Sequence, residues 1–221
     1  HIGDMVIRLF KQTIAEIHQA RKAEGVEFPE VDVVEVWDKV ITALKQQGIV
    51  DPQCEVDLYE LAIAFECLVN PVYPMPKMKE LILWLTGRGI LLGIISNAQF
   101  FTPMVLNFFL GANGCKVDEV SLFDPELTVF SYKFGRAKPD IELFKIAKDR
   151  LLARSILPEE VLFIGNDMLK DIYPAQKVGF RTALFAGDTR SLRLRKEKTG
   201  LENVSPDIII TELEQLYEVI V

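Results

Sequence analysis

The first 70 residues carry apolar side chains at intervals of three and four positions, the spacing of one face of an α-helix. Three such stripes occur, within residues 6–17, 33–44 and 58–69, and stretches containing Gly and Pro separate them. No run with the alternation of a strand lies between them. The pattern therefore predicts an all-helical domain over residues 1–70.

The pattern changes after a proline-rich stretch at residues 70–76, which we interpret as a hinge. Beyond it, short apolar runs alternate with helical periodicity, and this order predicts right-handed βαβ units. We therefore expect an α/β fold over residues 71–221, with a doubly wound, Rossmann-like parallel sheet. The expected strands cover residues 90–96, 127–132, 161–165, 182–186 and 207–211, and the expected helices cover 77–89, 100–111, 140–152, 171–179 and 212–221.

Composition narrows the classes of function. With 49% hydrophobic and 26% charged residues the chain is typical of a globular protein, and its net charge of −7 disfavours nucleic acid as a partner. Its apolar runs are too short to cross a membrane. Three scattered cysteines, Cys54, Cys67 and Cys115, indicate structural thiols in a reduced, cytoplasmic protein. With only His1 and His18, catalysis must use carboxylates, lysine and backbone groups.

The first candidate cluster is Ser96 with Asn97, directly after the run at residues 90–96. In open parallel sheets, ligands bind beyond the carboxyl ends of the strands. A hydroxyl and backbone N–H groups at such a turn suit a phosphate oxygen. The alternative is an ordinary turn or helix cap, for which Ser and Asn are equally common.

The second cluster is centred on Lys138, which precedes Pro139. Proline disfavours helix at the residue before it, so Lys138 should lie at the mouth of the next helix. A fixed ammonium group there could neutralise a phosphoryl oxygen or an aspartate. The alternative is a solvent-facing lysine in a turn, and Lys133 and Arg136 are further candidates for the cation.

The third cluster is Asn166, Asp167 and Asp171, at the end of the apolar run at residues 161–165. Carboxylate and amide oxygens are hard ligands suited to Mg²⁺, which usually takes one or two protein carboxylates together with waters and substrate oxygens. The alternative gives Asp171 the role of N-cap for the following helix and leaves Asp167 as a loop residue.

Two further groups have simpler explanations. Five basic side chains within residues 190–198 could attract an anionic substrate, but a solvated face explains them as well. Four phenylalanines follow Ser96 at helical spacing and predict core packing, although Phe100 or Phe101 could also border a pocket. The four are Phe100, Phe101, Phe108 and Phe109.

Order and spacing of the three clusters resemble the haloacid dehalogenase-like (HAD) hydrolase superfamily. Its second motif is a Ser or Thr after a strand, its third a Lys often followed by Pro, and its fourth a strand that ends in Gly and paired acids. Here these resemble "IISNAQ", "GRAKPD" and "FIGNDMLKD". The residue after the Gly is often Asp in that superfamily; here it is Asn166, so Asp167 and Asp171 are the preferred pair and Asn166 a supporting or alternative ligand.

The superfamily's first motif, an Asp-x-Asp at the end of a central strand, is absent from the chain. Asp4 is no substitute, because it begins a helical pattern and follows no strand. Without the central strand two inner sheet edges would stay unpaired. We therefore expect the natural protein to carry that strand, with the nucleophilic aspartate, before His1; a degenerate protein that lacks it is the alternative.

The resemblance implies a Mg²⁺-dependent phosphatase that acts on a small phosphomonoester through an aspartyl-phosphate. Ser96, Asn97 and Lys138 would bind the phosphoryl group, Asp167 and Asp171 would hold the metal, and the helical segment would be the cap that selects the substrate. Two alternatives remain. One is a dehalogenase, which needs no metal; the presence of a second acid, Asp171, disfavours it. The other is a catalytically inactive protein that binds a phosphorylated ligand.

Overall fold

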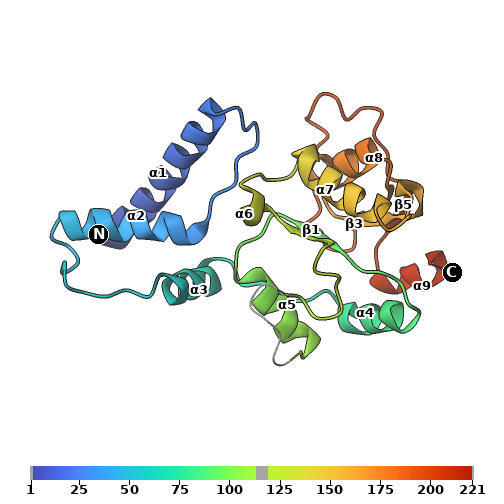
Figure 1. Ribbon diagram of the computed structural model, residues 1–221, viewed down its shortest axis with the longest axis horizontal. Helices are drawn as coiled ribbons and strands as arrows, with labels where there is room; N and C mark the ends of the chain where they lie inside the picture. Colours follow the sequence, from blue (N-terminus) through green and yellow to red (C-terminus); the bar gives the residue numbers. More distant parts are fainter. Residues whose placement is uncertain (1, 113–118, 221) are drawn as a thin grey trace. The chain divides into compact units, whose positions relative to one another are not determined.

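The computed structural model describes residues 2–112 and 119–220 of the chain (Figure 1). Cys115, expected to be a structural thiol, lies outside the described residues. The chain divides into two compact units, each built from two segments. Unit 1 comprises His1–Tyr73 and Tyr132–Arg136, and unit 2 comprises Pro74–Ser131 and Ala137–Val221.

Unit 1 is helical, as the apolar stripes predict. Each of the second and third helices begins at an aspartate: Asp32 accepts a hydrogen bond from the N–H of Val34 at 2.8 Å, and Asp57 accepts from that of Tyr59 at 2.9 Å. These side chains satisfy N–H groups that a helix start leaves without partners. The helices are α1 (Ile2–Ala23), α2 (Val33–Gln46) and α3 (Leu58–Val69), and the short α6 (Ser131–Phe134) follows later in the chain.

The core of unit 1 centres on three aromatic rings from its three long helices. The centroids of Phe10 and Trp37 lie 4.8 Å apart, and Phe65 lies 5.0 Å from Trp37. Trp37 is only 3% exposed and lies in the core of this unit. Cys54 and Cys67, two of the three cysteines expected to be structural thiols, are free and exposed.

Unit 2 contains two parallel sheets, which confirms the α/β fold class. One sheet has the order β1–β2 and the other the order β3–β4–β5. The first strand is shorter than predicted: the carbonyl of Leu92 accepts from the N–H of Asp124, but the regular ladder begins only with the pair Ile94–Thr128. The strands are β1 (Ile94–Ser96), β2 (Thr128–Phe130), β3 (Leu162–Gly165), β4 (Arg181–Phe185) and β5 (Ile208–Ile210).

Helices flank these strands in unit 2 (Figure 1). Leu81 and Leu85 of α4 pack with Ile210 of β5 and Leu216 of α9 in one buried cluster. The prediction that the phenylalanines after Ser96 are core residues holds for Phe100 but is wrong for Phe108, which is 78% exposed. The helices are α4 (Met78–Gly87), α5 (Thr102–Leu110), α7 (Ile141–Leu152), α8 (Tyr173–Val178) and α9 (Leu216–Val219), with short helical turns at η1 (Pro158–Glu160), η2 (Met168–Ile172) and η3 (Leu213–Gln215).

Within the described part of the chain, none of the helices combines the length and the apolar character that crossing a membrane requires.

Candidate active site

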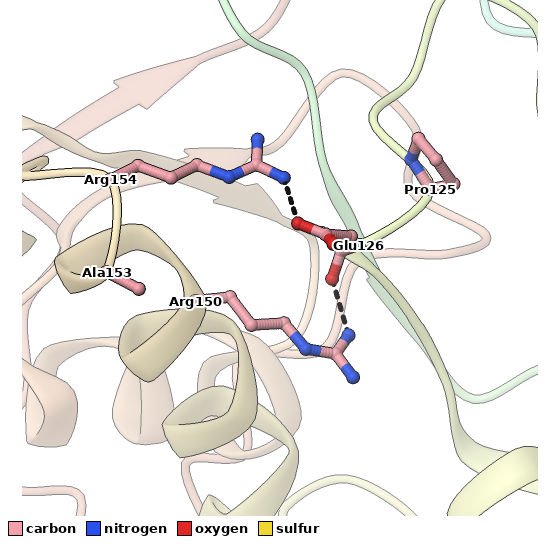
Figure 2. A pocket seen from close by; sticks show the side chains of 5 residues that line it. All are labelled: Pro125, Glu126, Arg150, Ala153 and Arg154. Carbon is pink, nitrogen blue, oxygen red and sulfur yellow. Dashed lines mark hydrogen bonds and ion pairs between the residues drawn. The ribbon is translucent and has the colours of Figure 1, made fainter.

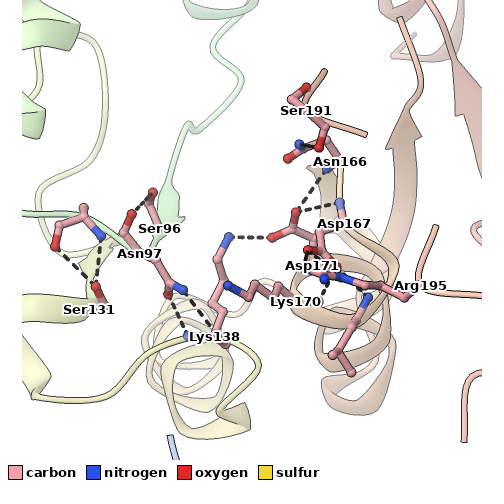
Figure 3. A network of polar contacts seen from close by, with 12 residues as sticks. Ser96, Asn97, Ser131, Lys138, Asn166, Asp167, Lys170, Asp171, Ser191 and Arg195 are labelled. Carbon is pink, nitrogen blue, oxygen red and sulfur yellow. Dashed lines mark hydrogen bonds and ion pairs between the residues drawn. The ribbon is translucent and has the colours of Figure 1, made fainter. Parts of the chain in front are cut away.

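The first two predicted clusters lie side by side in unit 2. Ser96 ends β1, and the side chain of Asn97 binds the main chain of Lys138 with both ends of its amide. Its Oδ1 accepts from the Lys138 N–H at 2.6 Å, and its Nδ2 donates to the Lys138 carbonyl at 3.3 Å. The Ser96 hydroxyl donates to the Asn97 carbonyl at 3.3 Å. The strand-end turn and the lysine are therefore one connected structure (Figure 3).

A buried serine that sequence reasoning missed holds this turn. Ser131 has no exposed surface, and its Oγ accepts from the Ala98 N–H at 2.9 Å. The same hydroxyl donates to the Ala98 carbonyl at 3.3 Å. Ser131 follows the fully buried strand β2 directly, and a polar residue at that position is the signal that could have revealed it.

Lys138 brings the second and third clusters together. It lies just before α7, whose N-cap is Asp140, and so at the mouth of that helix as predicted. Its Nζ lies 2.5 Å from Oδ1 of Asp171, and the two side chains are only 12% and 6% exposed. A buried charge without a partner is costly, so each member of this pair compensates the charge of the other. The solvent-facing alternative for Lys138 is therefore wrong.

The other two basic candidates belong to a different compact unit from Lys138. Lys133 and Arg136 belong to unit 1, whereas Lys138 and the acids belong to unit 2. Lys138 is therefore the predicted cation that contacts a predicted acid within one compact unit.

The second oxygen of Asp171 is held by the backbone at the end of β3. Its Oδ2 accepts from the N–H groups of Asn166 and Asp167, each at 3.0 Å. The side chain lies so close to the strand that a Cβ on Gly165 would stand 2.3 Å from the Asp171 Cβ. The glycine that ends β3 is therefore required by the approach of this carboxylate.

Asp167 has a different environment from Asp171. It is the N-cap of η2, a single π-helical turn, and its Oδ1 accepts from the N–H groups of Leu169 at 2.9 Å and Lys170 at 3.1 Å. The alternative that made Asp171 the N-cap of the following helix is wrong, because Asp171 lies inside η2 and the N-cap position of α8 is Ile172. The guanidinium of Arg195 also binds Asp167, with its Nη2 at 2.6 Å from Oδ2.

These contacts determine the charge of Asp167. Burial alone would raise the pKa of its carboxyl group, but the hydrogen bonds from Arg195 and from the backbone N–H groups of Lys170 and Leu169 outweigh burial, and the pKa is lowered. The carboxylate in turn raises the pKa of Arg195. The pair is therefore ionised at neutral pH.

Arg195 is a second residue that sequence reasoning missed. The basic run at residues 190–198 was the signal, but its spacing does not distinguish the side chain that turns inward from those that face solvent. Arg195 reaches an acid that is only 6% exposed, whereas the adjacent Lys196 is exposed. The solvated-face interpretation therefore does not apply to Arg195.

The carboxylate oxygens near the end of β3 fit a magnesium ion only in part. An ionised carboxylate offers about four lone-pair positions. Asp171 uses three, for Lys138 and two backbone N–H groups, whereas Asp167 accepts contacts from Leu169, Lys170 and the Arg195 fork. Among the described residues no group of three or more His, Cys, Asp or Glu side chains is placed to hold a metal.

Asn166 completes the set of predicted ligands. Its Nδ2 donates a hydrogen bond to the Ser191 carbonyl at 2.6 Å. This bond fixes the orientation of the amide and leaves its oxygen as the atom that could bind a cation. Asp171 and the Asn166 oxygen are therefore better suited to a cation than Asp167 is.

A surface depression of about 540 Å³ lies apart from these residues in unit 2 (Figure 2). It is lined by Pro125, Glu126, Arg150, Ala153 and Arg154, and contains none of the predicted site residues. Its arginines already have acceptors: Arg154 binds Asp124 and Glu126, and Arg150 donates to the Glu126 carbonyl. The charges of this depression are satisfied within the protein, so it is not the candidate site.

Residues 135–216 match the model of the HAD-hydrolase-like family, and this segment contains Lys138, Asp167 and Asp171. The chain also has the fold of solved HAD structures, among them a HAD phosphatase from Thermococcus onnurineus, with a TM-score of 0.54 and 18% identity over 99% of this chain and 89% of that one. The segment at residues 135–216 therefore matches the HAD-hydrolase-like family, and the chain shares the fold of the solved HAD structures.

Curated relatives of this chain include phosphatases. A glyceraldehyde 3-phosphate phosphatase from Pyrococcus furiosus is 37% identical over 87 residues, which are 39% of this chain and 32% of that protein. The enzyme of the same name from Methanocaldococcus jannaschii is 26% identical over 147 residues, 66% of this chain and 56% of that protein. The matches thus span from about a third to just over half of these relatives' lengths.

Solved dehalogenases share the fold of this chain. The L-2-haloacid dehalogenase from Xanthobacter autotrophicus aligns with a TM-score of 0.58 and 18% identity, over 99% of this chain and 86% of that one. At this identity the likeness concerns the fold, which HAD proteins with different chemistries have in common.

Proposed function

We propose that this HAD hydrolase is a phosphatase that acts on a small phosphomonoester. The observation that carries the proposal is the buried Lys138–Asp171 pair, joined through the Lys138 main chain to the Ser96–Asn97 turn. Phosphoryl transfer requires mainly positioning and the neutralisation of negative charge, and this cluster supplies a fixed ammonium group, a hydroxyl and strand-end backbone N–H groups. The curated phosphatases among the relatives support a phosphate ester as the substrate.

In this proposal each residue has one role toward the phosphoryl group. The Lys138 ammonium neutralises an equatorial oxygen, and the Ser96 hydroxyl together with the backbone N–H of Asn97 donates to the others. Asp171 pairs with Lys138 and directs it. These interactions strengthen as negative charge develops on the transferred group, which is the requirement for catalysis rather than for binding alone.

The nucleophile is proposed to be an aspartate on a strand that precedes His1, as the resemblance implies. β1 pairs only with β2, and β3 only with β4, among the described strands, so each has an edge open to a further parallel strand. Attack by that aspartate on phosphorus would form an aspartyl-phosphate and release the alcohol, and water would then hydrolyse the phosphoenzyme.

Magnesium is the proposed cofactor, with Asp171 and the Asn166 oxygen as its ligands in this chain. When bound, it would neutralise charge on the phosphoryl group. Asp167, the third ligand predicted from the sequence, could join only if the Arg195 fork left it, because its acceptor positions are occupied.

We further propose that the helical segment at residues 1–70 is the cap that selects the substrate, and that residues 71–221 are the core. The proline-rich stretch at 70–76 supports this division, because prolines limit the directions in which a connecting segment can bend. The exposed free thiols of Cys54 and Cys67 support the reducing cytoplasm as its compartment.

A dehalogenase is the second candidate. It is favoured by one specific observation: both acids at the end of β3 already have a cation, Lys138 for Asp171 and Arg195 for Asp167. A site whose charges are balanced without a metal suits chemistry that needs none.

One assay separates the two candidates. The full-length protein is incubated with an aryl phosphate or with a 2-halo acid, each with Mg²⁺ or with EDTA. A phosphatase releases phosphate with Mg²⁺ and loses activity in EDTA, and Lys138→Met abolishes the release, whereas Lys145→Met, on an exposed helix face, leaves it intact. Halide release in EDTA favours the dehalogenase. No turnover of a panel of phosphomonoesters or of the halo acid would contradict both and favour a binding role.

A further inference from the structure

The segment after β4 folds back along the end of β3. Arg193 donates its N–H to the Asn166 carbonyl at 2.9 Å, and the Met168 N–H donates to the Arg193 carbonyl at 2.9 Å. The Asn166 side chain adds a bond to the Ser191 carbonyl at 2.6 Å. Arg193 therefore forms an isolated parallel bridge with Asp167, and we call residues 191–195 the clasp segment.

Arg195, at the end of the clasp segment, binds the Asp167 carboxylate with two nitrogens of its guanidinium fork. Its Nε lies 3.2 Å from both carboxylate oxygens, and its Nη2 lies 2.6 Å from Oδ2. Arg195 has φ +54°, in the left-handed region that side-chain-bearing residues rarely adopt. A charged fork of this kind combines strength with a defined orientation, so it can hold the backbone in that conformation.

Apolar contacts hold the rest of the segment in the same place. Leu192 packs against the buried cluster of Met168, Ile172 and Leu184. The first two of these residues belong to the π-helical turn. Leu201 and Val204, farther along the same connection, pack against it as well. The clasp segment is thus attached to the turn by main-chain hydrogen bonds, an ion pair and a hydrophobic contact.

The turn that the clasp segment holds is the one that positions Asp171. The backbone N–H groups of Asn166 and Asp167 both donate to Asp171 Oδ2 at 3.0 Å, and the other oxygen of Asp171 faces Lys138 at 2.5 Å. A shift of the Asp167 backbone would therefore move the carboxylate that directs Lys138.

We propose that Arg195 is a positioning residue for the Lys138–Asp171 pair, acting through Asp167, and that Asp167 is the anchor of the clasp segment rather than a metal ligand. Asp167 and Asp171 then bind two different cations. Asp171 binds Lys138 and faces the reacting group, whereas Asp167 binds Arg195 and faces inward. The effect on turnover rests on the proposed phosphatase function, whereas the effect on the turn does not.

The test compares Arg195→Gln and Arg195→Lys with Lys196→Gln, which removes the same charge from the exposed neighbouring residue. Amide hydrogen exchange in the full-length protein reports the N–H groups of Asn166, Asp167 and Met168. Arg195→Gln should accelerate their exchange at least ~10-fold, and Arg195→Lys, whose ammonium cannot form the fork, by less. Lys196→Gln should leave the exchange rates unchanged.

Kinetics and metal titration give the second readout. Arg195→Gln should lower kcat about 10-fold with KM changed less than about threefold, because a displaced Asp171 weakens transition-state rather than ground-state contacts. Asp167→Asn should change the affinity for Mg²⁺ alone, measured by calorimetry, by less than about threefold, since a lost carboxylate ligand would weaken it more.

Different outcomes overturn different parts. Unchanged exchange in Arg195→Gln overturns the positioning role, as does accelerated exchange with an unaltered kcat. A large loss of Mg²⁺ affinity in Asp167→Asn overturns the anchor assignment. If the full-length protein hydrolyses no phosphate ester, the proposed function fails, and the exchange measurements still decide whether Arg195 holds the turn.

Discussion

The ammonium group of Lys138 and the carboxylate of Asp171 form a buried ion pair that joins the start of α7 to the turn after β3. Because the two residues come from segments on either side of β3, the pair fixes the relative positions of two of the three predicted clusters. Its burial distinguishes it from the exposed ion pairs of the same unit.

Removing one member of this pair should be costly. We expect Lys138→Met to lower the free energy of unfolding by about 3–5 kcal/mol, because it leaves Asp171 charged and without its cation. Chemical denaturation measures this. Lys145→Met is the matched control, since Lys145 pairs with Glu142 at an exposed helix face and should cost less than about 1 kcal/mol. Equal losses in the two variants would contradict the importance of burial.

A methyl group added at Gly165, at the end of β3, should displace the side chain of Asp171. In Gly165→Ala the new Cβ would meet the Asp171 Cβ at 2.3 Å, so the side chain or the strand must shift. We expect a loss of about 1–3 kcal/mol, measured by thermal or chemical unfolding. Gly87→Ala is the control, because nothing lies within 4 Å of its added Cβ. A neutral Gly165→Ala would show that Asp171 has room to move.

Acid should weaken unit 2 through Asp124. Hydrogen bonds from Arg154 lower the pKa of this carboxyl below its ordinary value of 3.8, aided by the backbone N–H groups of Leu127 and Glu126. A carboxyl group with a lowered pKa stabilises the fold above its unfolded-state value, and this contribution is lost as the pH falls through the folded-state value. The free energy of unfolding should therefore decline below about pH 4.

The matching experiment measures unfolding against pH in two variants. Asp124→Asn should flatten the decline on the acid side, because the titrating group is gone. Asp149→Asn, an exposed residue of α7, should retain the profile of the unaltered protein. If the Asp124→Asn profile kept the full slope, other carboxyl groups would be responsible for it.

The cap of α3 should contribute to the stability of unit 1. Asp57 accepts from the N–H groups of Tyr59 and Glu60, at 2.9 and 3.0 Å. We expect Asp57→Ala to cost about 1 kcal/mol, whereas Asp57→Asn, which keeps an acceptor oxygen, should cost much less. Hydrogen exchange of the α3 amides would detect the difference, and identical exchange in both variants would refute the capping role.

Local sequence signals predicted much of the fold. The three helical stripes correspond to α1 to α3. Because burial on one or both faces leaves a periodic trace, each strand of the described sheets coincides with a predicted apolar run, although β4 begins one residue earlier, at Arg181. Strand ends were less certain: residues 90–93 were predicted as strand but lie before the regular ladder, where Leu92 accepts from the N–H of Asp124. Phe108 fits a helical pattern yet faces solvent, since spacing alone does not say which side of a helix is covered.

The site was predictable where its residues follow strands and not where they come from loops. Ser96, Lys138 and Asp171 were marked by their places at strand ends and before a proline. Arg195 was not, because its contact with Asp167 depends on how a long connection folds back. Sequence also treated Asp167 and Asp171 as equivalent, although one faces Arg195 and the other Lys138.

Unit 1 is assembled from segments that the ribosome produces at different times. The N–H of Glu30 donates to the carbonyl of Gly135 at 3.1 Å, and Pro29 and Arg136 form an antiparallel bridge. These partners of residues 29 and 30 are synthesised only after most of the first unit and part of the second have emerged. Helices α1 to α3 can therefore form early, but the unit reaches its complete set of contacts only once residue 136 has left the exit tunnel.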